Sequence, residues 1–314
     1  MFKDANTIRK KVSSLATGRR GRSKEKTKII LKLLKEYPET KTSEWIKVAK
    51  LPKSSYYEWK IKLENPVDKD KKIREEIKSI VKATKGRYGY RRVCKTLRNK
   101  GLIVNHKRVL RIMRQEGLLC TKFKTRSRKY SSYKGQVGKV APNIVNRNFK
   151  AKKPNRIWLT DVTEFRIKGN EKRLYLSPIL DVYNSEIISY TLSHHPTIKL
   201  TNTMLEEATK RIEESNDLVI HSDQGFHYQH SSWSSKLKKL NIKQSMSRKG
   251  NCLDNSPMEN FFGILKQEMY YGVEFKSYKQ LRKEIESYIK WYNEDRIKTK
   301  LNGMSPVDYR LHSA

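Results

Sequence analysis

The feature that most constrains the fold of this chain is the pattern that begins at Arg156. Three β-rich runs follow one another there: "RIWLTDVTEFRI", "KRLYLSPILDVYN" and "SEIISYTLSHH". Turn-forming residues separate them, with Gly169 and Asn170 at the first join and Asn184 and Ser185 at the second. Joins this short connect antiparallel neighbours, so the sequence predicts a meander of three strands.

Helical and strand patterns alternate after the meander. In order they are the helix "KLTNTMLEEATKRIEE", the strand "DLVIHSD", a helix around "SWSSKLKKL", the strand "IKQSMS" and a helix that begins in "SPMENFFGILK". Three strands, helix, strand, helix, strand, helix is the order of a ribonuclease-H-like mixed sheet. We therefore predict a ribonuclease-H-like α/β core over residues 156–272, followed by a C-terminal helical segment over residues 273–314.

The charge of the chain is unevenly distributed. The 314 residues contain 70 Lys and Arg against 32 Asp and Glu, a formal net charge of +38. Residues 1–150 hold 44 of those basic and 12 of those acidic residues, whereas residues 151–314 hold 26 and 20. Such a basic half predicts a polyanionic partner, with nucleic acid first among the candidates.

Several classes of protein are disfavoured by the same composition. No apolar run approaches the roughly 18 residues of a membrane span, and the N-terminus lacks the apolar core of a secretory signal, so we expect no membrane partner. The three cysteines, Cys94, Cys120 and Cys252, lie far apart without a CxxC spacing. Neither a disulfide framework nor a cysteine zinc site is indicated, and a reducing intracellular compartment is expected.

The N-terminal half is predicted to be all-α. Residues 1–26 are interpreted as a basic arm. Residues 27–64 contain three helical patterns, "TKIILKLLKEY", "TSEWIKVAKL" and "PKSSYYEWKIKL", which make a helix-turn-helix candidate with Tyr56 and Tyr57 as possible DNA contacts. A small helical bundle with an aromatic core explains the same pattern, and the sequence does not decide between the two.

A second helix-turn-helix domain is predicted over residues 69–120. Its last two helices are "YGYRRVCKTLRNKGL" and "NHKRVLRIMRQEGLL", with Gly101 marking a stop and Asn105 the next cap. Residues 121–155 form a basic linker with interleaved rings, suited to a phosphate backbone and to base stacking, although an ordinary linker has the same composition. The candidate DNA-binding residues of this domain are Arg91, Arg92, Lys107, Arg108 and Arg111.

Three acidic residues stand out in the predicted core. Asp161 lies within the first strand run, Asp223 follows the apolar run "LVI", and Glu259 opens the helix of "SPMENFFGILK". If the two strands are neighbours, both aspartates face one point. Acids without a cysteine pair suit Mg²⁺ or Mn²⁺ better than zinc, although His221 and His227 keep zinc open. Two such ions can drive phosphodiester chemistry.

Each acid also has a local structural interpretation. Glu259 is the last residue of a possible capping box, "SPME", in which Ser256 is the N-cap. Asp161 could cap a turn, and Asp223 could form an Asx-turn into Gly225.

The helix that carries Glu259 has two distinct faces. Its predicted buried stripe consists of Met258, Phe261, Phe262, Leu265 and Met269. Glu259, Gly263 and Lys266 share a different face, where a carboxylate, a position without a side chain and a cation would allow a DNA backbone to approach. A capping box explains Glu259 but does not explain Gly263 or Lys266.

Together these motifs resemble the DD(35)E core of retroviral integrases and related transposases. The chain is most similar to the bacterial insertion-sequence transposases whose second reading frame encodes an integrase-like core. "WLTDVTEF", "HSDQGFHY" and "RKGNCLDNSPMENFFGILKQE" carry the likeness, with 35 residues between Asp223 and Glu259. "YNEDRIKTKLNGMSPVDY" is similar to the closing segment of that family, and "YGYRRVCKTLRNKGLIVNHKRVLRIMRQEGL" to its helix-turn-helix.

The resemblance implies a DNA transposase that cleaves 3′ ends and transfers strands with two Mg²⁺ or Mn²⁺ ions per active site. Asp161 would bridge both ions, Asp223 would complete one and Glu259 the other. One 3′-hydroxyl at an element end would attack the other end, and the joined intermediate would become a circle that is later inserted into a target. Lys266, Asn251 and Asn255 would contact the terminal nucleotides, and Arg248 and Lys249 are further DNA-binding candidates.

The partners implied are double-stranded DNA, as element ends and target, and further copies of the chain, at least a dimer, in the bacterial cytoplasm at the nucleoid. The sequence lacks a sustained heptad before Trp45, so we expect a second-frame product or a relative with a reduced N-terminus. Phe226 and His227 stand where small or polar residues are expected. A non-catalytic DNA-binding regulator and a nuclease without joining activity are the rival hypotheses.

Overall fold

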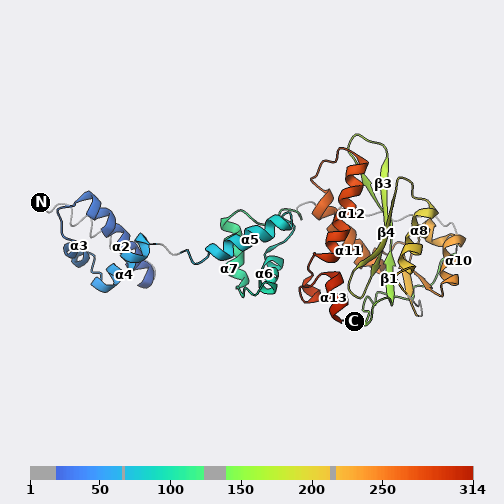
Figure 1. Ribbon diagram of the computed structural model, residues 1–314, viewed down its shortest axis with the longest axis horizontal. Coiled ribbons are helices and arrows are strands. Elements are labelled where there is room, and N and C mark those ends of the chain that lie inside the picture. The colour runs from blue at the N-terminus through green and yellow to red at the C-terminus, as the bar shows by residue number, and fades with distance from the viewer. Residues whose placement is uncertain (1–18, 66–67, 124–138, 213–216, 314) are drawn as a thin grey trace. The chain divides into compact units, whose positions relative to one another are not determined.

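The computed structural model describes residues 19–65, 68–123, 139–212 and 217–313, and its contacts divide the chain into two compact units, Met1–Ile73 and Arg74–Ala314. Most of the predicted basic arm and residues 124–138 of the predicted linker lie outside the described residues. Figure 1 shows the elements in chain order.

Among its described residues, the first unit contains the helices α2 (Arg19–Glu36), α3 (Thr42–Val48) and α4 (Lys53–Glu64). Their apolar faces enclose a small core that includes Ile30, Ile46 and Tyr56. Tyr56 is 0% exposed, so its prediction as a DNA contact is wrong: the ring fills the core. Tyr57 is 44% exposed and stays available on the surface of α4. The three helices therefore form a bundle with Tyr56 inside it and Tyr57 outside.

The next three helices are α5 (Lys71–Ala83), α6 (Tyr90–Asn99) and α7 (His106–Gln115). The side chain of Asn105 accepts a hydrogen bond from the Lys107 amide at 2.8 Å, which confirms the predicted cap of α7. Gly101 follows α6 with a φ of +80°, a conformation that suits glycine at a helix end. Val109 and Met113 are fully buried, as the helical periodicity predicts.

A mixed sheet forms the centre of the second unit. Its strands are β1 (Ile157–Thr160), β2 (Thr163–Arg166), β3 (Arg173–Asp181), β4 (Ile187–Ser193), β5 (Val219–Ser222) and β6 (Lys243–Met246). β3 pairs antiparallel with β1, β2 and β4, which confirms the meander, while β5 lies parallel to both β1 and β6.

The first β-rich run is two strands rather than the single strand predicted. The break falls at Asp161 and Val162, where the Val162 amide donates to Asp161 Oδ1 at 2.7 Å. A side chain thus takes the place of the neighbouring strand as the acceptor for this amide. The interruption turns the chain at the residue that the sequence singles out as catalytic.

Helices cover both faces of the sheet (Figure 1). One face carries α11 (Ser256–Leu265) and α12 (Tyr278–Glu294), and the other carries α8 (Ile198–Thr209) and α10 (Ser231–Lys239). The remaining elements are the short helix α9 (Phe226–Gln229), the 3₁₀ turn Cys252–Asn255, the π-helical turn Lys266–Tyr270, the 3₁₀ turn Thr299–Leu301 and α13 (Pro306–Ser313). This arrangement is the predicted ribonuclease-H-like fold. Within it, α9 was not predicted as a helix.

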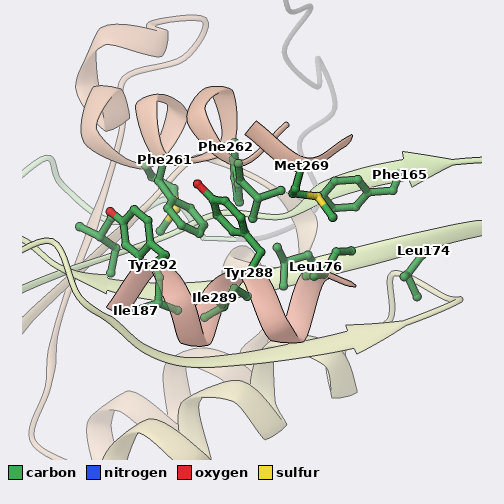
Figure 2. Packing of buried hydrophobic residues seen from close by; sticks show 14 of the residues in the cluster. Phe165, Leu174, Leu176, Ile187, Phe261, Phe262, Met269, Tyr288, Ile289 and Tyr292 are labelled. Carbon is green, nitrogen blue, oxygen red and sulfur yellow. The ribbon is translucent and has the colours of Figure 1, made fainter. Parts of the chain in front are cut away.

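The larger core cluster lies between the sheet and α11 with α12 (Figure 2). All five residues of the stripe predicted for the Glu259 helix are buried in it or at its edge. Phe261 packs edge-on against Tyr292 of α12, with ring centroids 5.0 Å apart. The opposite face of α11, which carries Glu259, is therefore turned away from the core.

A buried ion-pair cluster lies at the π-helical turn. The side chain of Glu268 is 0% exposed and accepts from Arg296 Nε at 2.9 Å, from Arg296 Nη2 at 2.6 Å and from the Tyr288 hydroxyl at 2.8 Å. Arg92 of α6 donates to the same carboxylate at 3.3 Å. Since Glu268 lies two residues after Lys266, this cluster ties α6 and the C-terminal segment to the end of the helix that carries Glu259.

Candidate active site

The two aspartates are brought together by a pair of neighbouring strands. β1 and β5 are parallel, with Leu159 opposite His221, so their carboxyl ends meet at one edge of the sheet. Asp161 directly follows β1, and Asp223 directly follows β5. Both side chains line a cavity of about 470 Å³, together with Lys266. The predicted convergence of these two residues is confirmed.

The local interpretations of these aspartates are also correct, and they are compatible with a catalytic role. Asp161 Oδ1 accepts from the Val162 amide, and Asp223 Oδ1 accepts from the Gly225 amide at 2.9 Å, the predicted Asx-turn. In the described chain no residue donates to Oδ2 of either aspartate. A Cβ added to Gly225 would approach Asp223 Oδ1 to 2.9 Å, so this turn requires a glycine. The turn bonds orient the carboxylates while each keeps an oxygen available.

The electrostatics of the pair are unfavourable in the absence of a cation. Burial raises the pKa of Asp161 well above its ordinary value, and the like charges of Asp223 and Glu259 raise it further. Burial also raises the pKa of Asp223 and that of Glu259. Carboxyl groups in this state gain from a positive charge placed between them.

Glu259 does not form the predicted capping box. The N-cap of α11 is Asn255, no side chain caps the helix, and Ser256 is already helical because the 3₁₀ turn Cys252–Asn255 runs into it. Glu259 therefore lies one position further along the helix than a capping box requires. The Asn255 side chain instead donates to the Thr160 carbonyl at 3.2 Å, which pins the start of α11 to the end of β1. This contact holds Glu259 on the side of Asp161.

The side predicted to face DNA also includes Gly263 on α11 and Lys266 directly after it. Gly263 is exposed, and a Cβ added to it would have no atom within 4 Å, so the surface above it is open. Lys266 lines the cavity with its ammonium 5.4 Å from the centre of the Phe165 ring. Burial lowers the pKa of Lys266, while Glu164 and Asp161 raise it. A phosphate placed in the cavity would add a further anion beside this cation.

Residues 247–255, between β6 and α11, form a basic loop whose side chains are held together by Asp254. This buried carboxylate accepts from Arg147 Nε at 2.7 Å and from Arg248 Nε and Nη2 at 2.9 and 2.8 Å. Arg147 also donates to the Asn251 side chain at 2.9 Å. Two of the predicted DNA contacts, Arg248 and Asn251, thus form hydrogen bonds that shape the loop, while Arg248 and Lys249 are both exposed.

Replacing Asp254 with asparagine should lower the free energy of unfolding at pH 7 by about 1–3 kcal/mol, since charge-assisted hydrogen bonds are lost. The hydrogen bonds from Arg248 hold the pKa of Asp254 well below its ordinary value. Its contribution is therefore complete above the unfolded-state pKa of about 3.9 and is lost as pH falls through the lower folded-state pKa. Urea titrations at pH 7 and below pH 4 should show the difference from wild type shrinking in acid.

Asp217, which is 70% exposed and pairs with Lys243 on the surface, provides the control for this prediction. Asp217→Asn should change the unfolding free energy by less than about 1 kcal/mol. Equal unfolding curves for wild type and Asp254→Asn at pH 7 would contradict the role assigned to this carboxylate.

Both histidines that kept a zinc site open are engaged elsewhere. His221 is buried between the hydroxyls of Ser245 and Ser247, at 2.8 and 3.1 Å, and burial lowers its pKa to about 4. His227 Nε2 lies 2.8 Å from the Pro196 carbonyl, to which it donates. Both nitrogens of His221 and Nε2 of His227 are thus taken by hydrogen bonds within the protein, which disfavours the zinc alternative.

The described residues contain no set of three or more His, Cys, Asp and Glu side chains already placed around a single metal position. The donor chemistry nevertheless fits a hard divalent cation, because Asp161 and Asp223 offer carboxylate oxygens to one cavity, and Lys266 lowers the pKa of Asp161 by less than burial and Asp223 raise it. Asp161 and Asp223 already line one cavity. Glu259 is not part of its lining, but its charge raises the pKa of Asp161.

The predicted DNA-binding residues of the second helix-turn-helix differ in accessibility. Arg91, Lys107 and Arg111 are exposed and Arg108 is half-buried. Arg92 is engaged in the protein interior by the Glu268 cluster, so its prediction as a DNA contact is corrected: its charge stabilises a buried carboxylate.

One residue of the cavity, Glu164, was missed in the sequence. Glu164 lines it and pairs with Arg166 and Arg173, at 2.7 and 2.9 Å. Its position three residues after Asp161 in "TDVTEF" was the available signal. Phe226 also lines the cavity and stacks on His227, with ring centroids 3.7 Å apart. The sequence marked Phe226 and His227 as unexpected and gave no reason for them.

The fold and this site define a class, the polynucleotidyl transferases with an integrase core. Two models of an integrase core domain match residues 151–252 and 259–313, and a model of a helix-turn-helix-like domain matches residues 68–127. The second integrase-core match begins at Glu259 and extends through α12 and α13.

The chain belongs to the insertion-sequence transposases of this class. It is 42% identical to the putative transposase InsK for insertion sequence element IS150 of Escherichia coli (strain K12), over 90% of this chain and 97% of that protein. It is also 49% identical to an uncharacterized transposase-like protein of Haemophilus influenzae, over 67% of this chain and 94% of that one. Its enzyme class is thus the DDE transposases and integrases.

Solved structures of lower similarity include the HTLV-2 integrase catalytic core domain in complex with magnesium, at 18% identity and a TM-score of 0.41, over 50% of this chain and 97% of that one. A simian T-cell lymphotropic virus intasome has 16% identity and a TM-score of 0.44, over 71% of this chain and 70% of that one. Across the described residues no helix has the length and apolarity that crossing a membrane requires.

Proposed function

We propose that this transposase cleaves the 3′ ends of its insertion sequence and transfers them to DNA at the cavity lined by Asp161 and Asp223. The observation that carries the proposal is the meeting of these two carboxylates at the ends of neighbouring parallel strands, with Glu259 acting on the same point. Uncompensated acids in a protein of net charge +38 need a function that involves cations and a polyanion.

In this proposal Asp161, Asp223 and Glu259 hold divalent cations, Mg²⁺ or Mn²⁺. Such ions activate the attacking oxygen and stabilise the leaving oxygen of a phosphodiester. Two ions per site are proposed, as the resemblance to integrase cores implies. The raised pKa values of these groups mean that cation binding releases protons, so the apparent cation affinity should rise with pH.

The remaining residues of the site position DNA. Lys266 offers its ammonium to a phosphate from the same side of α11 as Glu259, and open Gly263 lets the backbone approach between them. Lys249 of the basic loop extends the contact. Asn255 contributes indirectly. Its hydrogen bond to the Thr160 carbonyl holds α11 against β1 and so fixes the position of Glu259.

The basic half supplies most of the DNA affinity. Arg91, Lys107 and Arg111 on α6 and α7, with Tyr57 and the lysines of the first unit, would contact element ends and target. Since two ends must be joined, the assembly on DNA is at least a dimer of this chain, acting in the bacterial cytoplasm at the nucleoid.

A steep fall of DNA affinity with salt is expected, because each neutralised phosphate releases counterions. With at least six phosphate contacts, the association constant should fall by roughly a thousandfold between 50 and 200 mM salt. Fluorescence anisotropy with labelled duplex DNA measures this directly. An affinity nearly independent of salt would contradict an electrostatic role for residues 1–150.

The experiment that tests the proposed function is transposition in bacteria. A marker gene is placed between the inverted repeats that flank this coding sequence, and the chain is expressed from a separate plasmid. Circular element junctions and new insertions should appear with wild type and not with Glu259→Gln. A protein that binds these repeats and yields no junction with either version would be the non-catalytic regulator.

A further inference from the structure

A second cavity adjoins the active site. It has a volume of about 410 Å³, and its walls include Lys172, Arg173, His194 and His195. Tyr175 and Pro196 line both this cavity and the one that holds Asp161 and Asp223. The two hollows therefore form one continuous surface that leads from the carboxylates to the beginning of β3.

Rings are presented along this surface on a rigid support. His227 donates to the Pro196 carbonyl, and Phe226 stacks on the His227 ring, so Phe226, half-buried, is held at the wall of the first cavity. His194 is fixed in the second cavity: its Nδ1 donates to the Arg173 carbonyl at 2.8 Å and its ring packs edge-on against Tyr278 at 5.1 Å.

The charge of the second cavity suits an anion. Lys172 and His195 are exposed at its wall, and Arg173 adds a cation that is shared with Glu164. Among the residues that line this cavity Glu171 is the acid. Cations that alternate with ring faces are the combination by which proteins bind single-stranded nucleic acid, whose unpaired bases stack while its phosphates are tracked. Paired bases do not offer these faces.

We infer that this surface, from Phe226 across Tyr175 and Pro196 to Lys172 and His195, binds an unpaired DNA strand continuous with the phosphodiester in the active site. The inference rests on the proposed function and adds to it the path of one strand. It also gives Phe226 and His227 a purpose: Phe226 is a stacking platform for a base next to the reacting phosphate, and His227 fixes it.

The test compares two DNA ends with the flanking repeat sequence, one blunt and one with a short unpaired tail on the reacting strand. Binding to the full chain is measured by fluorescence anisotropy without divalent cations, so that no reaction occurs. In wild type the tail should tighten binding roughly tenfold, the gain expected from stacking a base. The double variant Lys172→Glu, His195→Glu should lose this gain.

Lys239→Glu is the matched charge reversal, since this exposed lysine at the end of α10 lines neither cavity. It should keep the full gain from the tail. A 2-aminopurine base in the tail should be quenched by wild type and less quenched by Phe226→Leu, because leucine fills space without a ring. All the exchanged side chains lie at the surface or half-buried, and equal melting temperatures would show that each variant is folded.

Equal affinity of wild type for blunt and tailed ends overturns the inference, and so does a gain that survives in the double variant. Joining of DNA ends by wild type, measured in parallel with Mg²⁺, separates this failure from that of the proposed function. A protein that joins ends without any gain from the tail refutes the strand path alone. Absence of joining refutes the proposed function, while the binding comparison still decides the path.

Discussion

An Asp161→Asn variant should lose at least about a thousandfold in the rate of DNA end joining, because a cation ligand worth several kcal/mol in the transition state is removed. Its affinity for element ends should remain within about threefold of wild type, since the phosphate contacts lie mostly in the basic half. Joining is measured on gels with Mg²⁺ and affinity by anisotropy. Asp217→Asn, an exchange at the opposite end of β5, should leave both unchanged.

The same variant should be more stable than wild type at pH 7 in the absence of divalent cations. The pKa of Asp161 is raised in the folded state, chiefly by burial and then by Asp223. Below the unfolded-state pKa of about 3.9 the group is protonated in both states and has no effect; as pH rises above that value, the unfolded state gains by ionising and the fold loses stability. The stabilisation by asparagine should therefore appear above about pH 4.

Chemical denaturation at pH 3.5 and pH 7 checks this sign. A variant less stable than wild type at pH 7 without cations would mean that Asp161 is a structural residue. In the presence of Mg²⁺, wild type should instead be more stable than Asp161→Asn. Only wild type retains the carboxylate that holds the cation, and cation binding stabilises the folded state.

Glu268→Gln should lower the free energy of unfolding of the second unit by about 3–5 kcal/mol, or its melting temperature by roughly 10 °C. The carboxylate is fully buried, and its removal leaves Arg296, 1% exposed, as an uncompensated buried cation. Urea unfolding followed by tryptophan fluorescence gives the value, because Trp291 packs on Tyr288 beside the cluster.

Glu207→Gln is the control for this exchange. Its carboxylate is 51% exposed and pairs with Lys210 one turn along α8, so less than about 1 kcal/mol is expected. Equal losses in the two variants would show that the Glu268 cluster contributes no more than a surface ion pair does.

Much of the fold could be predicted because each local pattern agrees with its tertiary context. Turn residues and β-rich runs gave the meander, and the spacing of Met258, Phe261, Phe262 and Leu265 gave the buried face of α11. The meeting of Asp161 and Asp223 followed from the order of strands, since parallel neighbours end at the same edge of a sheet.

What could not be predicted depends on contacts between residues distant in sequence. Ser256 followed by Glu259 has the form of a capping box, yet the preceding 3₁₀ turn and the bond from Asn255 to β1 move the start of the helix by one residue. Arg92 and Tyr56 look like surface residues in their own helices. Arg92 donates to Glu268, which lies 176 residues away in the sequence. The packing of α2 and α3 encloses Tyr56.

The path of a DNA strand was likewise invisible in the sequence. Tyr175 and Pro196 lie in different segments, and only the pairing of β3 with β4 brings their neighbourhoods together. Periodicity shows which face of an element is apolar, but the joining of two cavities is a property of the assembled surface.

The central claim is that this chain joins DNA ends at one carboxylate centre. The most direct measurement is to incubate the purified protein with labelled DNA ends from the flanking repeats in Mg²⁺ and to resolve the products on a denaturing gel. The account predicts products longer than the substrate, in which one end is covalently joined to another, formed by wild type and by Asp217→Asn but not by Asp161→Asn, Asp223→Asn or Glu259→Gln. Nicked strands without any joined product, or joining retained in all three acid variants, would contradict it.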